Sequence, residues 1–211
     1  MARRNQRKEY GGLNIDQAKR WSAFLRHLVD RGLKGVQLII SDACRGLIES
    51  AAEYLPEAQW QRCMVHFYRN VFSHVPATKV RDVSHMLKAI HAQESHDAAD
   101  RKARAIVDDL RAARMNAAAD LVERSVHETL VYYAFPDIHW QKIRTNNPLE
   151  RIMREIRRRT RVVGAFPDGQ SCLNLAAARL RYIAGSAWST KRYMSMRPLY
   201  QTQVVQTGAV A

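Results

Sequence analysis

Two carboxylates stand where they could bind a divalent metal ion. Asp42 directly follows a short apolar run, and Glu150 lies at the start of an arginine-rich segment much later in the chain. Mg²⁺ prefers oxygen ligands and is commonly held by one or two carboxylates together with substrate phosphate. Two such ions can clamp the attacking and leaving oxygens of a phosphodiester. The types and spacing of these two residues suggest this chemistry without establishing it.

Asp42 ends a predicted strand. Residues 36–40 are mostly β-branched or aliphatic, and Gly35 precedes them, which indicates a short buried strand. Residues 45–55 then have apolar side chains at helical spacing. Ligands of open α/β sheets bind outside the carboxyl ends of the strands, so Asp42 is a candidate functional residue. Alternatively, Asp42 serves only as the N-cap of the following helix, for which Asp is a preferred residue.

Glu150 opens the most informative predicted helix. With Asn147 as N-cap and Pro148 at the first helical position, Glu150 would complete a capping box. It could also pair with Arg154 one turn on, or simply favour the positive end of the helix dipole. However, at 100° per residue it lies at the boundary between the apolar and arginine faces. A carboxylate there would sit beside any phosphodiester that the arginines bind.

An arginine face covers most of this helix. Leu149, Ile152, Met153 and Ile156 form the apolar side. Six arginines lie around the remainder, namely Arg151, Arg154, Arg157, Arg158, Arg159 and Arg161, with only Glu155 among them to offset their charge. Such a run is often just a solvated face. Because arginine forms bidentate pairs with phosphate, we expect contact with a DNA backbone instead.

Cys63 and His66 form a Cys-x-x-His pair within residues 60–66, a segment predicted to be extended. No second pair at zinc-finger spacing accompanies them, which argues against a structural zinc site. A buried thiol and a packed histidine are the simpler interpretation.

The composition favours a polyanionic partner. The chain has 211 residues, 34 Lys and Arg against 20 Asp and Glu, and a net charge of +14. Nucleic acid is the first candidate for that partner. No apolar stretch is long enough to span a bilayer, and we expect no membrane partner. Three widely spaced cysteines indicate free thiols in a reducing compartment.

The elements divide into four predicted regions. Residues 1–77 hold strands and helices. They begin with a weak strand at 9–15, and Asp16 then caps a helix that ends at Gly32. A βαβ unit with parallel strands follows. Residues 78–137 form an all-helical insertion. Residues 138–197 contain Glu150, the arginine face and a further amphipathic helix built on Leu173, Ala176, Leu180 and Ile183. Residues 198–211 are a flexible tail.

Several motifs in order resemble the Mutator-type transposases of bacterial insertion sequences. They are GVQLIISD at 35–42, WQRCMVHFYRN at 60–70, FP at 135–136, HW at 139–140, TNNPLER at 145–151 and RRRTRVVG at 157–164. Matches run from about residue 9 to residue 196. The resemblance implies a ribonuclease-H-like core of the DDE class, interrupted by a helical insertion. The fold class we predict is therefore α/β, helix-rich overall, with a partial ribonuclease-H-like core.

The resemblance also assigns roles to single residues. It makes Asp42 the second aspartate and Glu150 the glutamate of a DDE triad that binds Mg²⁺ or Mn²⁺. Cys63 and His66 match the family's Cys-x-x-His signature. The family's first aspartate lies on a strand upstream of anything present here, and Asp16 does not match it. We therefore expect a truncated copy that lacks the first strands and retains little catalysis of its own.

Two functions follow as expectations. The first is a transposase that cleaves and transfers strands at element ends, with DNA terminal repeats and target DNA as partners. The second is a non-catalytic basic DNA-binding protein that competes with intact transposase or joins it. We expect homo-oligomers or mixed oligomers with the full-length enzyme. We also expect a location in the bacterial cytoplasm, at the nucleoid.

Overall fold

The computed structural model describes residues 15–190 and 192–199. By its internal contacts the chain forms two compact units, residues 1–131 and 132–211, each of which is described here by itself. The predicted weak strand at 9–15 lies outside the described residues except for Ile15, which is helical. The described chain is helix-rich, as predicted. None of its helices is long and apolar enough to cross a membrane.

The first unit contains a small parallel sheet. Its elements in order are α1 (Ile15–Asp30), β1 (Leu38–Ser41), α2 (Arg45–Tyr54), β2 (Gln59–Arg62), α3 (Met64–Phe72), η1 (Ala77–Lys79), α4 (Val80–Ile90), α5 (His96–Ala112), α6 (Asn116–Ser125) and η2 (Val126–Thr129). Strands β1 and β2 pair in parallel, with Leu38 opposite Gln59 and Ser41 opposite Arg62. The predicted βαβ unit with parallel strands is thus confirmed.

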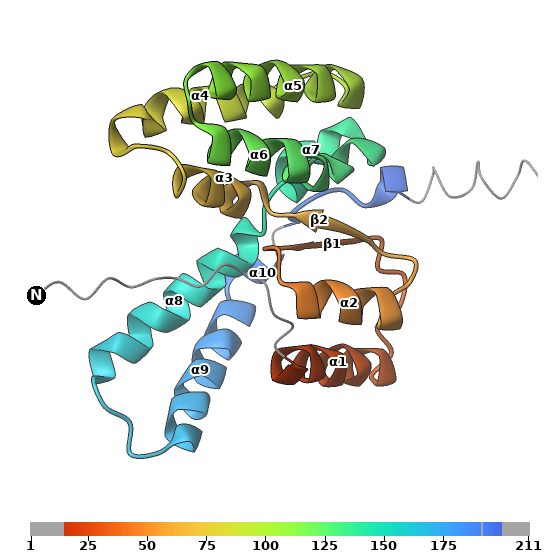
Figure 1. Ribbon diagram of the computed structural model, residues 1–211. Helices are drawn as coiled ribbons and strands as arrows, with labels where there is room; N and C mark the ends of the chain where they lie inside the picture. The colour runs from red at the N-terminus through yellow and green to blue at the C-terminus, as the bar shows by residue number, and fades with distance from the viewer. Residues whose placement is uncertain (1–14, 191, 200–211) are drawn as a thin grey trace, which may run out of the picture. The chain divides into compact units, whose positions relative to one another are not determined.

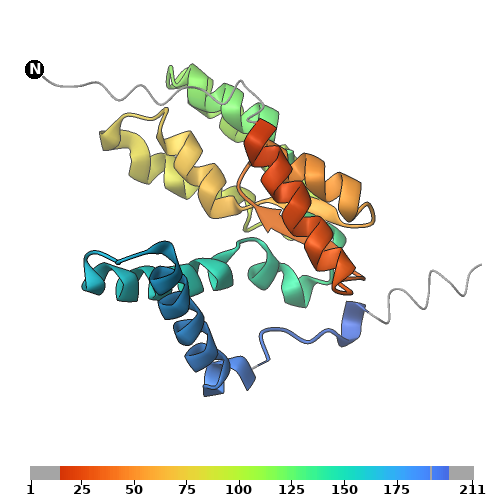
Figure 2. The ribbon, with the colours of Figure 1, turned by 90° about the horizontal axis from the view of Figure 1, so that it is seen from below.

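Helices α1 and α2 pack closely against each other, as Figures 1 and 2 show. A Cβ atom added to Gly46 would lie 3.0 Å from the Cα of Ala18, so only glycine allows this approach. Helix α1 begins at Ile15, which puts Asp16 inside the helix and contradicts its prediction as the cap. The helix ends as predicted. Gly32 has a φ of 94°, and the Leu33 N–H donates to the Leu28 carbonyl in a Schellman-type ending.

The larger core of this unit lies among α3, α4, α5, α6 and η2. Its fully buried apolar side chains include Phe67, Val71, Leu87, Ile90, Ile106, Leu110, Val122 and Leu130. His91 is buried among them, with one ring nitrogen 2.8 Å from the Tyr68 hydroxyl and the other 2.9 Å from the Thr129 hydroxyl. Between β2 and Tyr132 the described chain holds helices alone, so this core is built by helix packing.

All regular elements among the described residues of the second unit are helices. Its elements are η3 (Val131–Ala134), α7 (Asp137–Ile143), α8 (Asn147–Val163), α9 (Gly169–Ala184) and α10 (Ala187–Thr190). Helix α9 follows α8 after a loop and contacts it (Figure 1). Neither α8 nor α9 has a buried residue. At the C-terminal end of the described chain, Pro198 and Leu199 are helical, and Leu199 is buried rather than loose.

Candidate nucleic-acid interface and carboxylate positions

Asp42 lies at the carboxyl edge of the two-stranded sheet. Its side chain is exposed, and its carbonyl accepts a hydrogen bond of 2.7 Å from the Ser41 hydroxyl. The Trp60 indole N–H on β2 donates to that same hydroxyl at 2.9 Å. Asp42 is therefore fixed by its backbone, next to the last residue of β1, while its carboxylate is exposed.

The interpretation of Asp42 as a simple helix cap is wrong. The N-cap of α2 is Cys44, which makes no side-chain capping hydrogen bond. Two residues separate the strand end from that cap, so the Asp42 side chain is not at the capping position. The structure therefore argues against Asp42 as the N-cap of α2. It gives no direct evidence that Asp42 binds a metal ion.

Cys63 and His66 do not share an extended segment. Strand β2 ends at Arg62, Cys63 is the N-cap of α3, and His66 lies within that helix. The prediction failed because Phe67 and Val71, buried one turn apart, already belong to a helical pattern that begins at Met64. Cys63 is fully buried, and its N–H donates to the Ser41 carbonyl at 2.6 Å. Its position is that of a structural residue beside the strand ends.

Arg62, beside that cysteine, forms a buried ion pair that the sequence did not reveal. Its guanidinium lies 2.9 Å from the Glu128 carboxylate on η2, and the Arg62 side chain is only 7% exposed. The same guanidinium lies 5.5 Å from the centre of the Phe67 ring. The pair ties the end of β2 to the helical core. Because the two residues are distant in sequence, no local pattern could have predicted it.

Glu150 lies in the first turn of α8. Because the helix begins one residue earlier than predicted, Glu150 is its fourth residue and not its third. The N-cap is Asn146, which makes no side-chain capping hydrogen bond, so Asn147 and Pro148 are the first helical residues. The predicted capping box with Asn147 as cap is therefore wrong. Glu150 is half-buried. The helix ends at Gly164 as predicted, where a φ of 76° favours glycine.

All six predicted arginines of α8 are exposed, as Arg151, Arg154, Arg157, Arg158, Arg159 and Arg161. They are not equivalent. Arg158 lies 3.0 Å and Arg159 3.6 Å from the Glu155 carboxylate. Arg157 donates from Nε to the Met153 carbonyl at 3.2 Å. Within the described residues, Arg151, Arg154 and Arg161 make no ion pair, so their charges are the most available to an external anion.

Glu155 joins α8 to α9. Besides Arg158 and Arg159, its carboxylate accepts a short hydrogen bond from Arg179 of α9. Hydrogen bonding to Arg158, with the positive charges of Arg158 and Arg179, lowers the pKa of Glu155 from 4.5 to about 2. The sequence singled out this glutamate only as a minor offset to the arginines. Its partner Arg179 was missed, because cross-helix pairing depends on how α9 packs.

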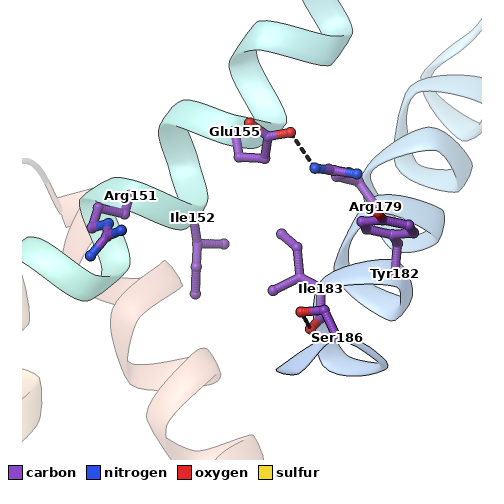
Figure 3. A pocket seen from close by; sticks show the side chains of 7 residues that line it. All are labelled: Arg151, Ile152, Glu155, Arg179, Tyr182, Ile183 and Ser186. Carbon is purple, nitrogen blue, oxygen red and sulfur yellow. Dashed lines mark hydrogen bonds and ion pairs between the residues drawn. The ribbon is translucent and has the colours of Figure 1, made fainter. Parts of the chain in front are cut away.

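A pocket of about 280 Å³ lies between α8 and α9 (Figure 3). Ile152 of α8 and Ile183 of α9 point into the space between the helices. Tyr182 lines the pocket with 67% of its surface exposed, and the Arg179 guanidinium lies 4.5 Å from the centre of its ring. Arg151, Glu155, Arg179 and Ser186 complete the lining. The pocket therefore combines an apolar floor with a cationic rim and an aromatic ring.

The predicted apolar face of α9 is only partly covered, because Ala176 and Ile183 are half-buried but Leu173 and Leu180 are exposed. Leu173 is 64% exposed and Leu180 is 44% exposed, whereas the lining residues Arg179 and Ile183 are half-buried. Helix α9 begins at the N-cap Asp168, which accepts a hydrogen bond of 2.6 Å from the Ser171 N–H. That hydrogen bond lowers the pKa of Asp168.

The two predicted metal ligands belong to different units. Asp42 is in the first unit and Glu150 in the second. Their carboxylate oxygens are of the type that Mg²⁺ prefers. Within the part of the chain that the structure describes, no group of three or more His, Cys, Asp or Glu side chains is placed to hold a metal ion. A site that uses both residues stays a prediction.

Comparison with known proteins identifies the class to which these features belong. The sequence profile described as "Transposase, Mutator family" matches residues 7–188. This chain belongs to the Mutator family of transposases.

Individual relatives carry the same description. The chain is 35% identical over 192 residues to the transposase for insertion sequence element ISRM5 of Rhizobium meliloti, covering 89% of this chain and 48% of the relative. It is 34% identical over 204 residues to the transposase for insertion sequence element IS1081 of Mycobacterium tuberculosis, covering 95% and 49%. The transposase for IS406 of Burkholderia multivorans is 36% identical over 179 residues, covering 84% and 46%. The chain spans about half the length of these relatives.

Proposed function

We propose that this chain acts on DNA in the transposition of an insertion sequence, and that α8 holds the DNA backbone. The observation that carries the proposal is the exposed arginine face of α8, together with membership of the family. Arg151, Arg154 and Arg161 project without ion pairs among the described residues, on a chain with a net charge of +14. Arginine in this state is suited to bidentate contact with phosphate.

The chemistry we propose is metal-dependent strand cleavage and strand transfer at the element's ends. Asp42 and Glu150 would hold Mg²⁺ or Mn²⁺, and the metal would polarise the phosphodiester and its attacking oxygen. The parallel β1–α2–β2 unit, with Asp42 at its carboxyl edge, supports assignment to a ribonuclease-H-like core. Further carboxylates of the DDE site would come from outside the residues that the structure describes.

A second candidate function is DNA binding without catalysis. It is favoured by a specific observation, namely that the arginine face lies wholly on α8 and needs neither Asp42 nor a metal. In this role the chain competes with full-length transposase for terminal repeats, or joins it in mixed oligomers at the nucleoid. The two functions share the same DNA contacts and differ in whether metal-dependent cleavage occurs.

The DNA contact is tested by measuring affinity for duplex DNA over a series of salt concentrations. We compare the wild-type chain with a triple variant in which Arg151, Arg154 and Arg161 are each replaced by glutamine. Each lost phosphate contact should reduce the slope of log affinity against log salt by about 0.9. We expect the triple variant to bind more weakly, with a shallower slope.

A matched control removes the same charge from the first unit. Arg81, Arg101 and Arg124 are exposed arginines of α4, α5 and α6, and we replace all three by glutamine. If this control loses as much affinity and slope as the α8 variant, binding depends on overall charge alone. That result, or unchanged binding by the α8 variant, contradicts the proposed role of α8.

A further inference from the structure

The pocket between α8 and α9 is built for more than a phosphate group. Part of its lining, called the apolar floor here, is formed by Ile152 and Ile183, which point into it from the two helices (Figure 3). An apolar floor gives no favourable contact to phosphate oxygens, which are strongly hydrated. It suits a planar group of low polarity instead.

Tyr182 adds an aromatic surface to that floor. The Arg179 guanidinium covers one face of its ring at 4.5 Å, while 67% of the residue is exposed. Arg179 donates a hydrogen bond to Glu155, which holds its guanidinium in place against the Tyr182 ring. The exposed part of the ring is available to a stacking partner. Bases stack on aromatic side chains with little dependence on sequence.

The rim supplies positive charge beside these apolar groups. Arg151 lines the pocket, is exposed and makes no ion pair among the described residues. A matching ligand carries a planar ring next to an anionic group. The ring would lie against Ile152 and Ile183, and the anionic group would pair with the Arg151 guanidinium. A nucleotide has these two parts. The volume of about 280 Å³ is close to the lower limit of small-molecule pockets, which suits one base better than a stacked pair.

We propose that this pocket binds one unpaired nucleotide of DNA, with its base between Ile152, Ile183 and Tyr182 and its phosphate on Arg151. The proposal rests on the proposed DNA binding by α8 and adds a preference for DNA in which one base has left the stack. A base within a duplex is covered by its neighbours and cannot enter a space between two helices.

The experiment compares two DNA duplexes of the same sequence, one fully paired and one with a single unpaired nucleotide. The fluorescent base analogue aminopurine, placed at the unpaired position, reports stacking in the pocket. We expect the wild-type chain to prefer the unpaired duplex by roughly tenfold and to quench the probe on binding. Tyr182→Ala should remove both the preference and the quenching while leaving affinity for paired DNA unchanged.

Two further variants make the result specific. Tyr182→Phe retains the ring and should retain the preference. Phe24→Ala removes another exposed aromatic ring, one on α1 of the first unit that lies outside the pocket. This control should behave like the wild type.

The outcomes separate the two proposals. Equal binding of both duplexes by the wild type, or a preference that survives Tyr182→Ala, overturns the pocket proposal and leaves DNA binding by α8 standing. Loss of preference in Phe24→Ala as well overturns it too, because the effect is then not specific to the pocket. Absence of binding to either duplex overturns both proposals.

Discussion

Glu155 links α8 to α9 through its contact with Arg179. One carboxylate accepts hydrogen bonds from Arg158 of its own helix and from Arg179 of the neighbouring helix. Arg179 in turn supports the ring of Tyr182. The same glutamate thus connects the arginine face, the helix pair and the pocket.

We predict that acid separates α8 from α9 through this residue. The folded-state pKa of Glu155 is about 2, below its ordinary value of 4.5. The carboxylate therefore stabilises the folded unit fully above pH 4.5, and its contribution declines as the pH falls from 4.5 toward 2. Cys172 lies on α9 and is half-buried. We expect its thiol to react with dipyridyl disulfide, a reagent that works in acid, at a rate that rises as the pH falls from 4.5 toward 2.

Glu155→Gln tests the cause directly. This variant should raise the reactivity of Cys172 already at neutral pH and remove the dependence of that reactivity on acid. Glu123→Gln, which breaks the exposed ion pair with Arg111, should leave both the reactivity and its pH dependence unchanged. Cys44 is replaced by serine throughout so that Cys172 is the only half-buried thiol measured. Identical acid profiles for the wild type and Glu155→Gln would show that another group opens the helix pair.

At the scale of elements, the contact of α1 with α2 depends on a small residue. An added Cβ at Gly46 would lie 3.0 Å from the Cα and 3.1 Å from the backbone nitrogen of Ala18. Backbone atoms cannot move aside as a flexible side chain can, so α1 would have to shift as a whole.

We predict that Gly46→Ala lowers the free energy of unfolding by about 1–3 kcal/mol, the usual cost of overpacking, in spite of alanine's better helix propensity. Chemical denaturation of the whole chain measures it. Gly169→Ala is the matched control, because Gly169 is also helical and nothing lies within 4 Å of its added Cβ. A Gly46→Ala chain as stable as the wild type would mean that α1 and α2 are not packed as described.

Local signals in the sequence predicted many elements well. The strand ending near Asp42, the helix after it, the glycine endings at Gly32 and Gly164 and the exposed arginines all agree with the structure. Each depends on residues within one or two turns of one another. The start of α3 was placed too late, because a strand running directly into a helix leaves no glycine or proline to mark the change.

Long-range features could not be predicted in the same way. The pair of Arg62 with Glu128 and the pair of Glu155 with Arg179 join residues from different elements. The packed face of α9 was misjudged at Leu173 and Leu180, because hydrophobic spacing marks an apolar stripe without showing what covers it. Family resemblance, by contrast, supplied the roles of Asp42 and Glu150, which neither spacing nor local structure establishes.

At the scale of the whole molecule, we propose that Asp42 and Glu150, one from each unit, bind the same metal ion. The first unit supplies Asp42, fixed at the end of β1, and the second supplies Glu150, in the first turn of α8. If the two carboxylates bind one metal ion, metal-dependent cleavage by this chain depends on both units.

Calorimetric titration of the chain with Mn²⁺ tests this claim most directly. We expect the wild type to bind Mn²⁺, and we expect Asp42→Asn and Glu150→Gln each to weaken binding by at least about tenfold, roughly 1.4 kcal/mol. Asp108→Asn, at an exposed aspartate of α5, should bind like the wild type. Absence of Mn²⁺ binding by the wild type, or unchanged binding by either carboxylate variant, would contradict the claim and leave DNA binding by α8 as the function to pursue.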